Sequence, residues 1–64
     1  MKTLKDWYEQ NIEILKAKNL HLKQQYVTPL YTFYLLKKTE YGELHIKDDW
    51  NSEYREYLEK TYNR

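Results

Sequence analysis

Hydrophobic positions near the start of the chain recur at helical spacing. The residues of this stripe are Leu4, Tyr8, Ile12 and Leu15, with Trp7 and Ile14 on its flanks. Charged residues alternate with them on the other side, which is typical of an amphipathic helix. Thr3 precedes the stripe and can cap the first turn with its hydroxyl. We therefore expect a helix that begins at about Leu4.

The end of this helix is less clearly marked. Asn19 favours a left-handed stop, whereas Leu22 and Tyr26 continue the helical period. Residues 20–28 are consistent with an extension of the helix, an additional strand or a loop.

The middle of the chain predicts a β-hairpin. Pro29 marks a break, and residues 30–36 are rich in aromatic and β-favouring side chains. Residues 44–47 form a short alternating run, and a loop over residues 40–42 would place Gly42 where a left-handed backbone is needed. A helix is the competing interpretation, with Thr28 as its cap, Pro29 in its first turn and Gly42 beyond its end.

A last helix is predicted from about Trp50 to Tyr62. Aromatic and aliphatic residues recur there at helical spacing, and Asp48 and Asp49 lie where the helix N-terminus is positive. The predicted fold class is α+β, a small single domain over residues 1–64 of helix–β-hairpin–helix (αββα) order. The alternative is an all-α three-helix domain.

The composition favours a folded binding protein. The 64 residues include eight Tyr, two Trp and one Phe, but one Gly and no Cys. Tyr suits positions that are half buried or in contact with another molecule. A domain of this size buries only about 60% of the surface of its unfolded chain. Self-association as a homodimer, or a bound partner, is therefore an expected source of stability.

The sequence offers little for catalysis. Ser52 is the one serine, and His21 and His45 fall in different predicted elements. Asp48 and Asp49 are adjacent, so their carboxylates do not converge by themselves on a metal or a substrate. We expect no enzyme activity, no cofactor and no metal site.

Location and charge add weak constraints. Residues 30–36, the longest apolar stretch, are far short of the roughly 20 residues that span a bilayer. Charges at positions 2, 5 and 6 argue against a secretion signal, and the absence of Cys fits the cytoplasm. A formal net charge of +1 lowers the expectation of nucleic-acid binding. We expect a cytoplasmic protein that does not bind membranes.

Two surfaces are predicted to contact a partner. In the hairpin, one face carries Tyr31, Phe33, Lys37, His45 and Lys47, an aromatic and basic set. The same aromatics at strand spacing are more typical of a core or a dimer interface, which is the favoured interpretation. The last helix adds Trp50, Tyr54 and Tyr57 as aromatic anchors.

The resulting hypothesis is a small, non-enzymatic protein-binding module that occupies a surface of a larger protein. Its size suits an accessory or inhibitory protein of a phage or mobile element. The alternative is a nucleic-acid-binding protein. In that case Lys37, Lys38 and Lys47 would hold phosphates, and Tyr31, Phe33 and His45 would stack on bases.

Overall fold

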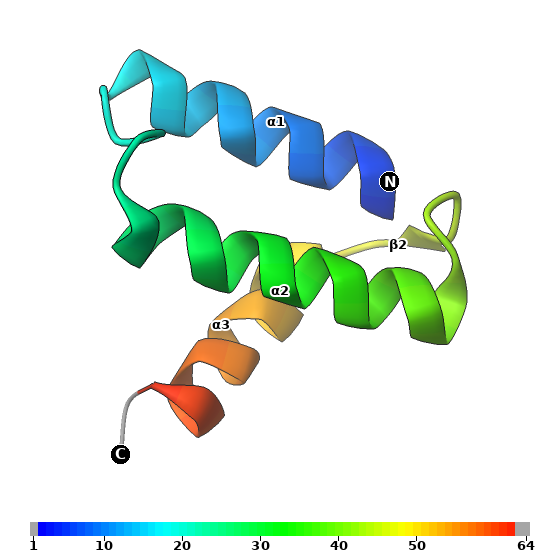
Figure 1. Cartoon of the computed structure of the whole chain (residues 1–64). Helices are drawn as coiled ribbons and strands as arrows, with labels where there is room; N and C mark the ends of the chain where they lie inside the picture. Colours follow the sequence, from blue (N-terminus) through cyan, green and yellow to red (C-terminus); the bar gives the residue numbers. More distant parts are fainter. Residues whose placement is uncertain (1, 63–64) are drawn as a thin grey trace.

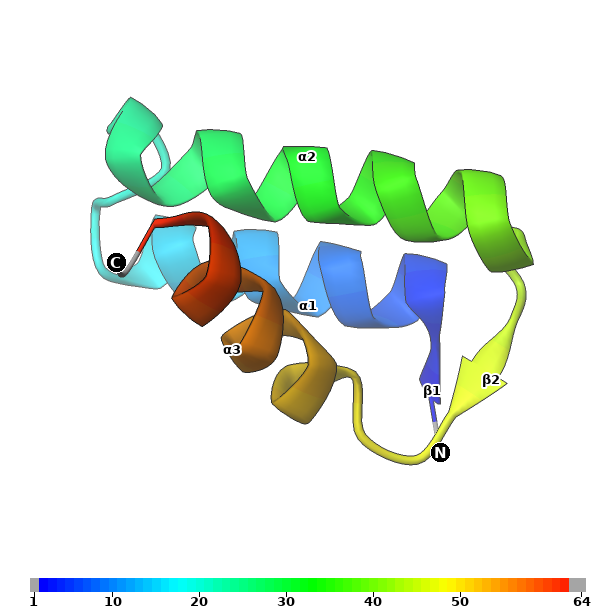
Figure 2. The ribbon, with the colours of Figure 1, turned by 90° about the horizontal axis from the view of Figure 1, so that it is seen from below.

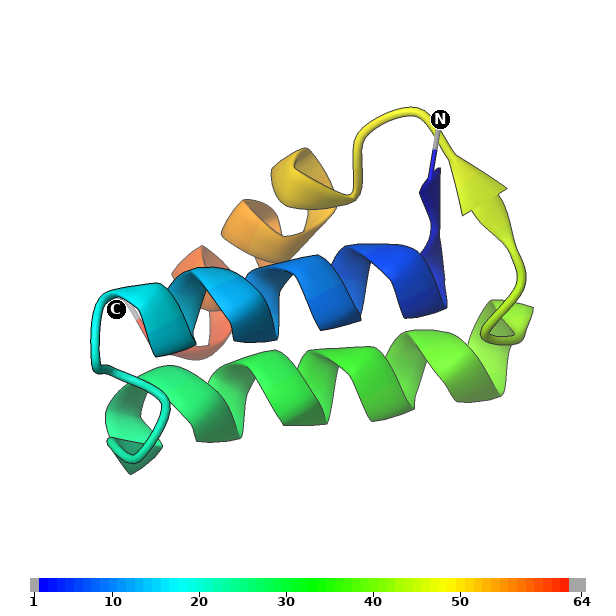
Figure 3. The same cartoon turned by 90° about the horizontal axis from the view of Figure 1, so that it is seen from above.

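The structure, a computed structural model, describes residues 2–62. Its elements in chain order are β1 (Lys2–Thr3), α1 (Leu4–Ala17), α2 (Gln24–Tyr41), β2 (Ile46–Lys47) and α3 (Trp50–Thr61). Helices α1 and α2 lie side by side and antiparallel (Figure 1). Helix α3 crosses this pair on one side, as the two turned views show (Figures 2 and 3). The structure is therefore a small helical domain with one short pair of strands.

Helix α1 begins where the sequence predicts. The Thr3 hydroxyl accepts a hydrogen bond from the amide of Asp6 at 3.0 Å. The amides of Leu4 and Lys5, which have no partner within the helix, donate to the carbonyls of His45 and Glu43 at 3.0 and 2.9 Å. The predicted start of this helix is confirmed, and a distant loop completes its N-terminus.

The helix ends at Ala17 and does not run on to residue 25. Asn19 has φ 59°, so the predicted left-handed stop is confirmed. A short turn follows, and α2 then starts at Gln24. Of the three possibilities for residues 20–28, the structure combines a turn with the first residues of a second helix.

The predicted β-hairpin is wrong. Residues 24–41 form a single helix, and the competing helical interpretation is correct in outline. Its start differs, because Pro29 lies inside the helix instead of in its first turn. Gly42 ends the helix with φ 91°, a backbone conformation that glycine adopts without a steric penalty.

Packing explains why the helix prevails over local propensity. Helical geometry places Leu30, Phe33 and Tyr34 on one face, and all three are buried. A strand would send Phe33 to the face opposite the other two. Strand propensities span only about 1 kcal/mol and depend on context, so burial of this face decides the outcome.

Helix α3 confirms a further part of the prediction, whereas the strands pair differently from the predicted hairpin. Asp49 caps α3 by accepting a hydrogen bond from the amide of Ser52 at 3.0 Å, and the helix starts at Trp50. Strand β2 pairs antiparallel with β1 at the start of the chain, in the register Lys2 to Lys47. The strands join distant segments, whereas the predicted hairpin joined neighbouring ones.

The core lies where the three helices meet. Its buried members are Leu4, Trp7, Leu30, Phe33, Tyr34 and Trp50. The ring of Trp7 packs edge-on against that of Phe33, with 5.4 Å between centroids. Both indole N–H groups have acceptors: Asn51 Oδ1 for Trp7 at 2.7 Å, and the Lys2 carbonyl for Trp50 at 3.2 Å.

Candidate functional site

Two of the predicted partner-binding residues lie inside the molecule. Phe33 is 0% exposed and Trp50 is 2% exposed. Their prediction as surface anchors is therefore wrong, because the helical fold turns both rings into the core. For Phe33, the favoured interpretation of these aromatics as packing residues holds. Tyr54 and Tyr57 are partly buried and pack against the Phe33 ring, with 5.1 and 5.4 Å between the ring centroids.

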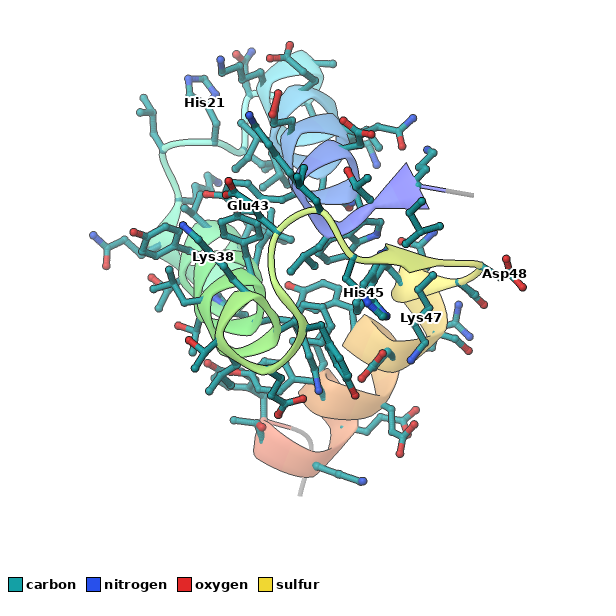
Figure 4. The ribbon with its side chains drawn as sticks, turned by 90° about the vertical axis from the view of Figure 1, so that its right-hand side faces the viewer. His21, Lys38, Glu43, His45, Lys47 and Asp48 are labelled. Carbon is teal, nitrogen blue, oxygen red and sulfur yellow. The ribbon has the colours of Figure 1, made fainter. Side chains whose placement is uncertain are left out.

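Lys37, His45 and Lys47 come together beside Trp50, at the end of α2 and the start of α3. The His45 ring stacks on Tyr41 at 4.8 Å and meets Trp50 edge-on at 5.9 Å. The Lys47 ammonium lies 5.5 Å from the centre of the Trp50 ring. In Figure 4, His45 and Lys47 lie close together above the start of α3, and Asp48 points away from them. We call Lys37, Tyr41, His45, Lys47 and Trp50 the aromatic and basic junction.

The cations of this junction are paired with carboxylates. Glu53 binds both lysines, Lys37 at 3.0 Å and Lys47 in a short contact, and Lys37 also pairs with Glu40 at 3.3 Å. Burial of Glu53 opposes ionisation, but the hydrogen bonds from Lys47 and Lys37 outweigh it and hold the pKa of Glu53 below its ordinary value. The junction is electrostatically compensated, which suits a structural tie between α2 and α3.

Tyr31, the remaining predicted contact residue, lies apart from the others. It is 49% exposed. Its ring is 6.2 Å from that of Tyr8, which in turn stacks on Tyr34 at 4.3 Å. Of the predicted set, the structure brings Lys37, His45 and Lys47 together beside the covered Trp50, and it packs Tyr54 and Tyr57 against the buried Phe33.

An apolar groove lies at the other half of α2, where all three helices converge. One hollow is lined by Gln24, Gln25, Thr28, Pro29, Leu58 and Tyr62. An adjoining hollow shares Gln25, Pro29 and Leu58 with it and adds Asn11, Leu15, Tyr26, Leu30 and Tyr54. We call the two together the three-helix groove.

The groove is uncharged throughout. None of its lining residues is ionised at neutral pH, although 33% of the chain is charged. Burial, together with the nearby Tyr57 and Tyr62, raises the pKa of Tyr54 to about 12, so this hydroxyl stays neutral well above physiological pH. The surroundings of Tyr54 are correspondingly apolar.

One backbone acceptor in the groove has lost its helical donor. In an α-helix the N–H of residue 29 would donate to the carbonyl of Gln25, but Pro29 has no N–H. Both residues line both hollows. The Gln25 carbonyl therefore retains capacity for a hydrogen bond next to an apolar surface.

The charges nearest the groove are mainly positive. Lys18 lies one turn after Leu15, Lys23 precedes Gln24, and Arg55 lies one turn before Leu58. None of the three forms an ion pair among the residues that the structure describes. Glu59, on the solvent side of α3, is the neighbouring acid.

Sequence reasoning missed most of this groove, of which it singled out Tyr54 alone. A signal was present: residues 24–36 are an uncharged run in a highly charged chain. In the folded helix, Tyr26, Tyr31, Leu35 and Leu36 of this run remain 41–49% exposed. In a strand, the apolar side chains of this run would be divided between the two faces of a sheet. The strand interpretation therefore gives no indication of a groove.

A further hollow of about 670 Å³ is charged and lies beside α3, where it is lined by Lys37, Lys47, Asp48, Asp49, Ser52, Glu53, Glu56, Tyr57 and Lys60. Between residues 2 and 62, no three His, Asp or Glu side chains lie close enough together to hold a metal ion. None of the helices in that range has both the length and the apolar content that crossing a membrane requires. Comparisons with protein-family models, with curated proteins and with solved structures returned no match.

Proposed function

We propose that this chain is a small, non-enzymatic protein-binding module and that the three-helix groove is its contact surface. The carrying observation is that an uncharged groove is left open at the junction of three helices in a highly charged chain. A mostly apolar hollow with a few polar groups at its edge is the first candidate for a binding site in a protein of unknown function. The module acts by occupying a surface of a larger protein.

The composition of the groove and its margin supports this proposal. Tyr26 and Tyr62 line it and are 41% and 54% exposed. Rigid aromatic side chains supply contact area with few rotatable bonds to immobilise, and tyrosine is enriched at protein interfaces for that reason. The adjacent Gln24, Gln25 and Thr28 provide hydrogen-bonding groups of the kind that fix the orientation of a partner.

The nucleic-acid alternative has less support. Each of its phosphate-binding candidates is paired with a carboxylate: Lys37 and Lys47 with Glu53, and Lys38 with Glu43 at 3.6 Å. Nucleic acid would have to displace these carboxylates before it gained the same charges. Phe33, one of the predicted stacking residues, is in the core.

The proposal is tested by filling the groove. Gln25 is exposed and lines both hollows, so Gln25→Trp blocks the groove without cutting into the core. Gln10→Trp makes the same change on an exposed position of α1 outside the groove and is the matched control. Tagged proteins are recovered from cells that express the chain naturally, with and without nuclease treatment, and co-purifying proteins and nucleic acids are identified.

A stoichiometric protein partner that is lost with Gln25→Trp and retained with Gln10→Trp is the expected result. Circular dichroism confirms that both variants keep their helical content. Partner recovery that is equal for the two variants would remove the groove as the contact surface, and recovery of nucleic acid alone would favour the alternative.

A further inference from the structure

We propose that the occupant of the three-helix groove is an acidic segment of a partner protein, anchored by a tryptophan side chain. This inference rests on the proposed function and specifies the chemistry of the partner. It follows from the charges around the groove and from the Gln25 carbonyl, which lacks its usual helical donor because residue 29 is proline.

The charged residues around the groove are mainly basic. Lys18, Lys23 and Arg55 are all exposed, form no ion pair within residues 2–62 and outnumber Glu59. Residues 14–39 contain no Asp or Glu, so the turn between α1 and α2 and the first half of α2 have no internal counter-charge. A partner segment with Asp or Glu on either side of its anchor complements this rim.

The cations of the aromatic and basic junction differ from those at the groove. There, Lys37 and Lys47 already share Glu53, and an acidic partner would gain little from them. At the groove the cations are free to pair with another molecule. Electrostatic complementarity of this kind raises association rates and selects among partners.

The Gln25 carbonyl favours tryptophan as the anchor. This acceptor has lost its helical donor to Pro29 and lies at an apolar surface, so the best anchor combines a large apolar body with one N–H donor. Tryptophan has this combination: its indole is mostly apolar and donates through a single N–H. The larger of the two hollows is open to solvent and has a volume of about 490 Å³, so it has room for an indole.

A synthetic peptide tests both features. The probe is a fluorescein-labelled peptide in which one Trp and two Leu are set among Glu residues. Its binding to the full-length protein is followed by fluorescence anisotropy at moderate salt. A second peptide replaces every Glu by Lys, and a third replaces Trp by 1-methyltryptophan, in which a methyl group takes the place of the indole N–H hydrogen.

The expected result is that the acidic peptide binds and the basic peptide does not. Loss of the N–H weakens binding by about tenfold, which corresponds to one hydrogen bond of about 1.4 kcal/mol. Pro29→Ala supplies an N–H for the Gln25 carbonyl and reduces the difference between the Trp and 1-methyltryptophan peptides. Helical content measured by circular dichroism shows whether this variant is folded.

Charge reversal on the protein provides the complementary test. The double variant Lys18→Glu, Lys23→Glu is expected to weaken binding of the acidic peptide by at least about tenfold. Lys5→Glu, on an exposed position of α1 away from the groove, is the control and leaves binding within about twofold.

Several outcomes would overturn the inference. These are no binding of the acidic peptide, equal binding of the acidic and basic peptides, equal binding of Trp and 1-methyltryptophan, or displacement of the peptide by a single-stranded oligonucleotide. Occupation of the groove by a second copy, seen as a dimer that the peptide does not dissociate, would overturn it as well. If the peptides fail while Gln25→Trp still abolishes capture of the natural partner, the proposed function stands and only this inference falls.

Discussion

The two halves of helix α2 meet the rest of the molecule in opposite ways. Its second half carries Lys37 and Tyr41 into the aromatic and basic junction, where each lysine has a carboxylate partner and the Trp50 ring is covered. Its first half borders the three-helix groove, which is uncharged and open. The charged end, which resembles a binding site in sequence, is thus a structural tie, whereas the inconspicuous uncharged end offers the better contact surface.

The largest expected effect is at the junction. Trp50→Ala removes a fully buried indole and its hydrogen bond to the Lys2 carbonyl. We expect the free energy of unfolding to fall by about 4 kcal/mol, which is a large part of the stability of so small a domain. Urea unfolding followed by circular dichroism measures the change. A loss below about 1 kcal/mol would mean that Trp50 is not a core residue and would restore it as a surface anchor.

A smaller effect is expected where the two helices are tied electrostatically. Glu53→Gln removes the partner of Lys37 and Lys47, which keep their charges. We expect a loss of about 1.5 kcal/mol, discounted for partial exposure of the pair. Glu59→Gln, an exposed residue on the same helix, is the control and should change stability by less than about 0.5 kcal/mol.

The same variant has a predicted pH signature. Because the folded-state pKa of Glu53 lies below its unfolded value, this carboxyl contributes stability above its ordinary pKa. That contribution is lost as the pH falls through the lowered folded-state pKa. The stability difference between the wild type and Glu53→Gln should therefore shrink in acid, and a difference that is constant with pH would contradict the ion-pair account.

At the groove, Tyr54 provides a probe of alkaline pH. Burial and the neighbouring Tyr57 and Tyr62 raise its pKa to about 12, above the ordinary value of about 10. A raised pKa means that stability from the neutral hydroxyl is present below about pH 10 and is lost as the pH rises toward about 12. Tyr54→Phe should be as stable as the wild type at neutral pH and lose less stability in this alkaline window. Phenolate absorbance measures the titration, and a midpoint near 10 for Tyr54 would contradict the apolar environment.

The smallest effect is expected on the exposed side of α3. Lys60 pairs with Glu56 at 3.0 Å, and both side chains are mostly in solvent. We expect Lys60→Ala to cost about 0.3 kcal/mol, since exposed pairs at this helical spacing contribute little. A loss comparable to that of Glu53→Gln would remove the distinction between the compensated junction and an ordinary solvated pair.

The sequence predicts the outer helices well. Thr3 and Asp49 indicate the starts of α1 and α3, where they cap the helices, and Asn19 indicates the end of α1. These signals are local, so they can be identified without knowledge of the tertiary fold. The position of Gly42 beyond a helix end is likewise a local signal, but a hairpin turn also favours glycine at this position.

Helix α2 and the candidate site depend on contacts between distant segments, so local sequence signals do not predict them. Residues 30–36 have strand-like composition, and only the packing of Phe33 and Tyr34 against α1 and α3 makes the helix preferable. Lys37 and Lys47 have the composition of a basic patch, but their shared carboxylate, Glu53, comes from another element. The groove is formed by three helices at once, so no single segment predicts it.

The hydrogen bonds from Leu4 and Lys5 to the loop before β2 have a consequence for amide hydrogen exchange. Amides in the first turn of a helix normally exchange rapidly, because no carbonyl of their own helix covers them. Here their acceptors are the carbonyls of His45 and Glu43, about forty residues away along the chain. Exchange at these two positions will therefore follow the release of the distant segment and not the fraying of α1. Two amides at the start of the chain thus report how often the loop between α2 and β2 detaches from α1.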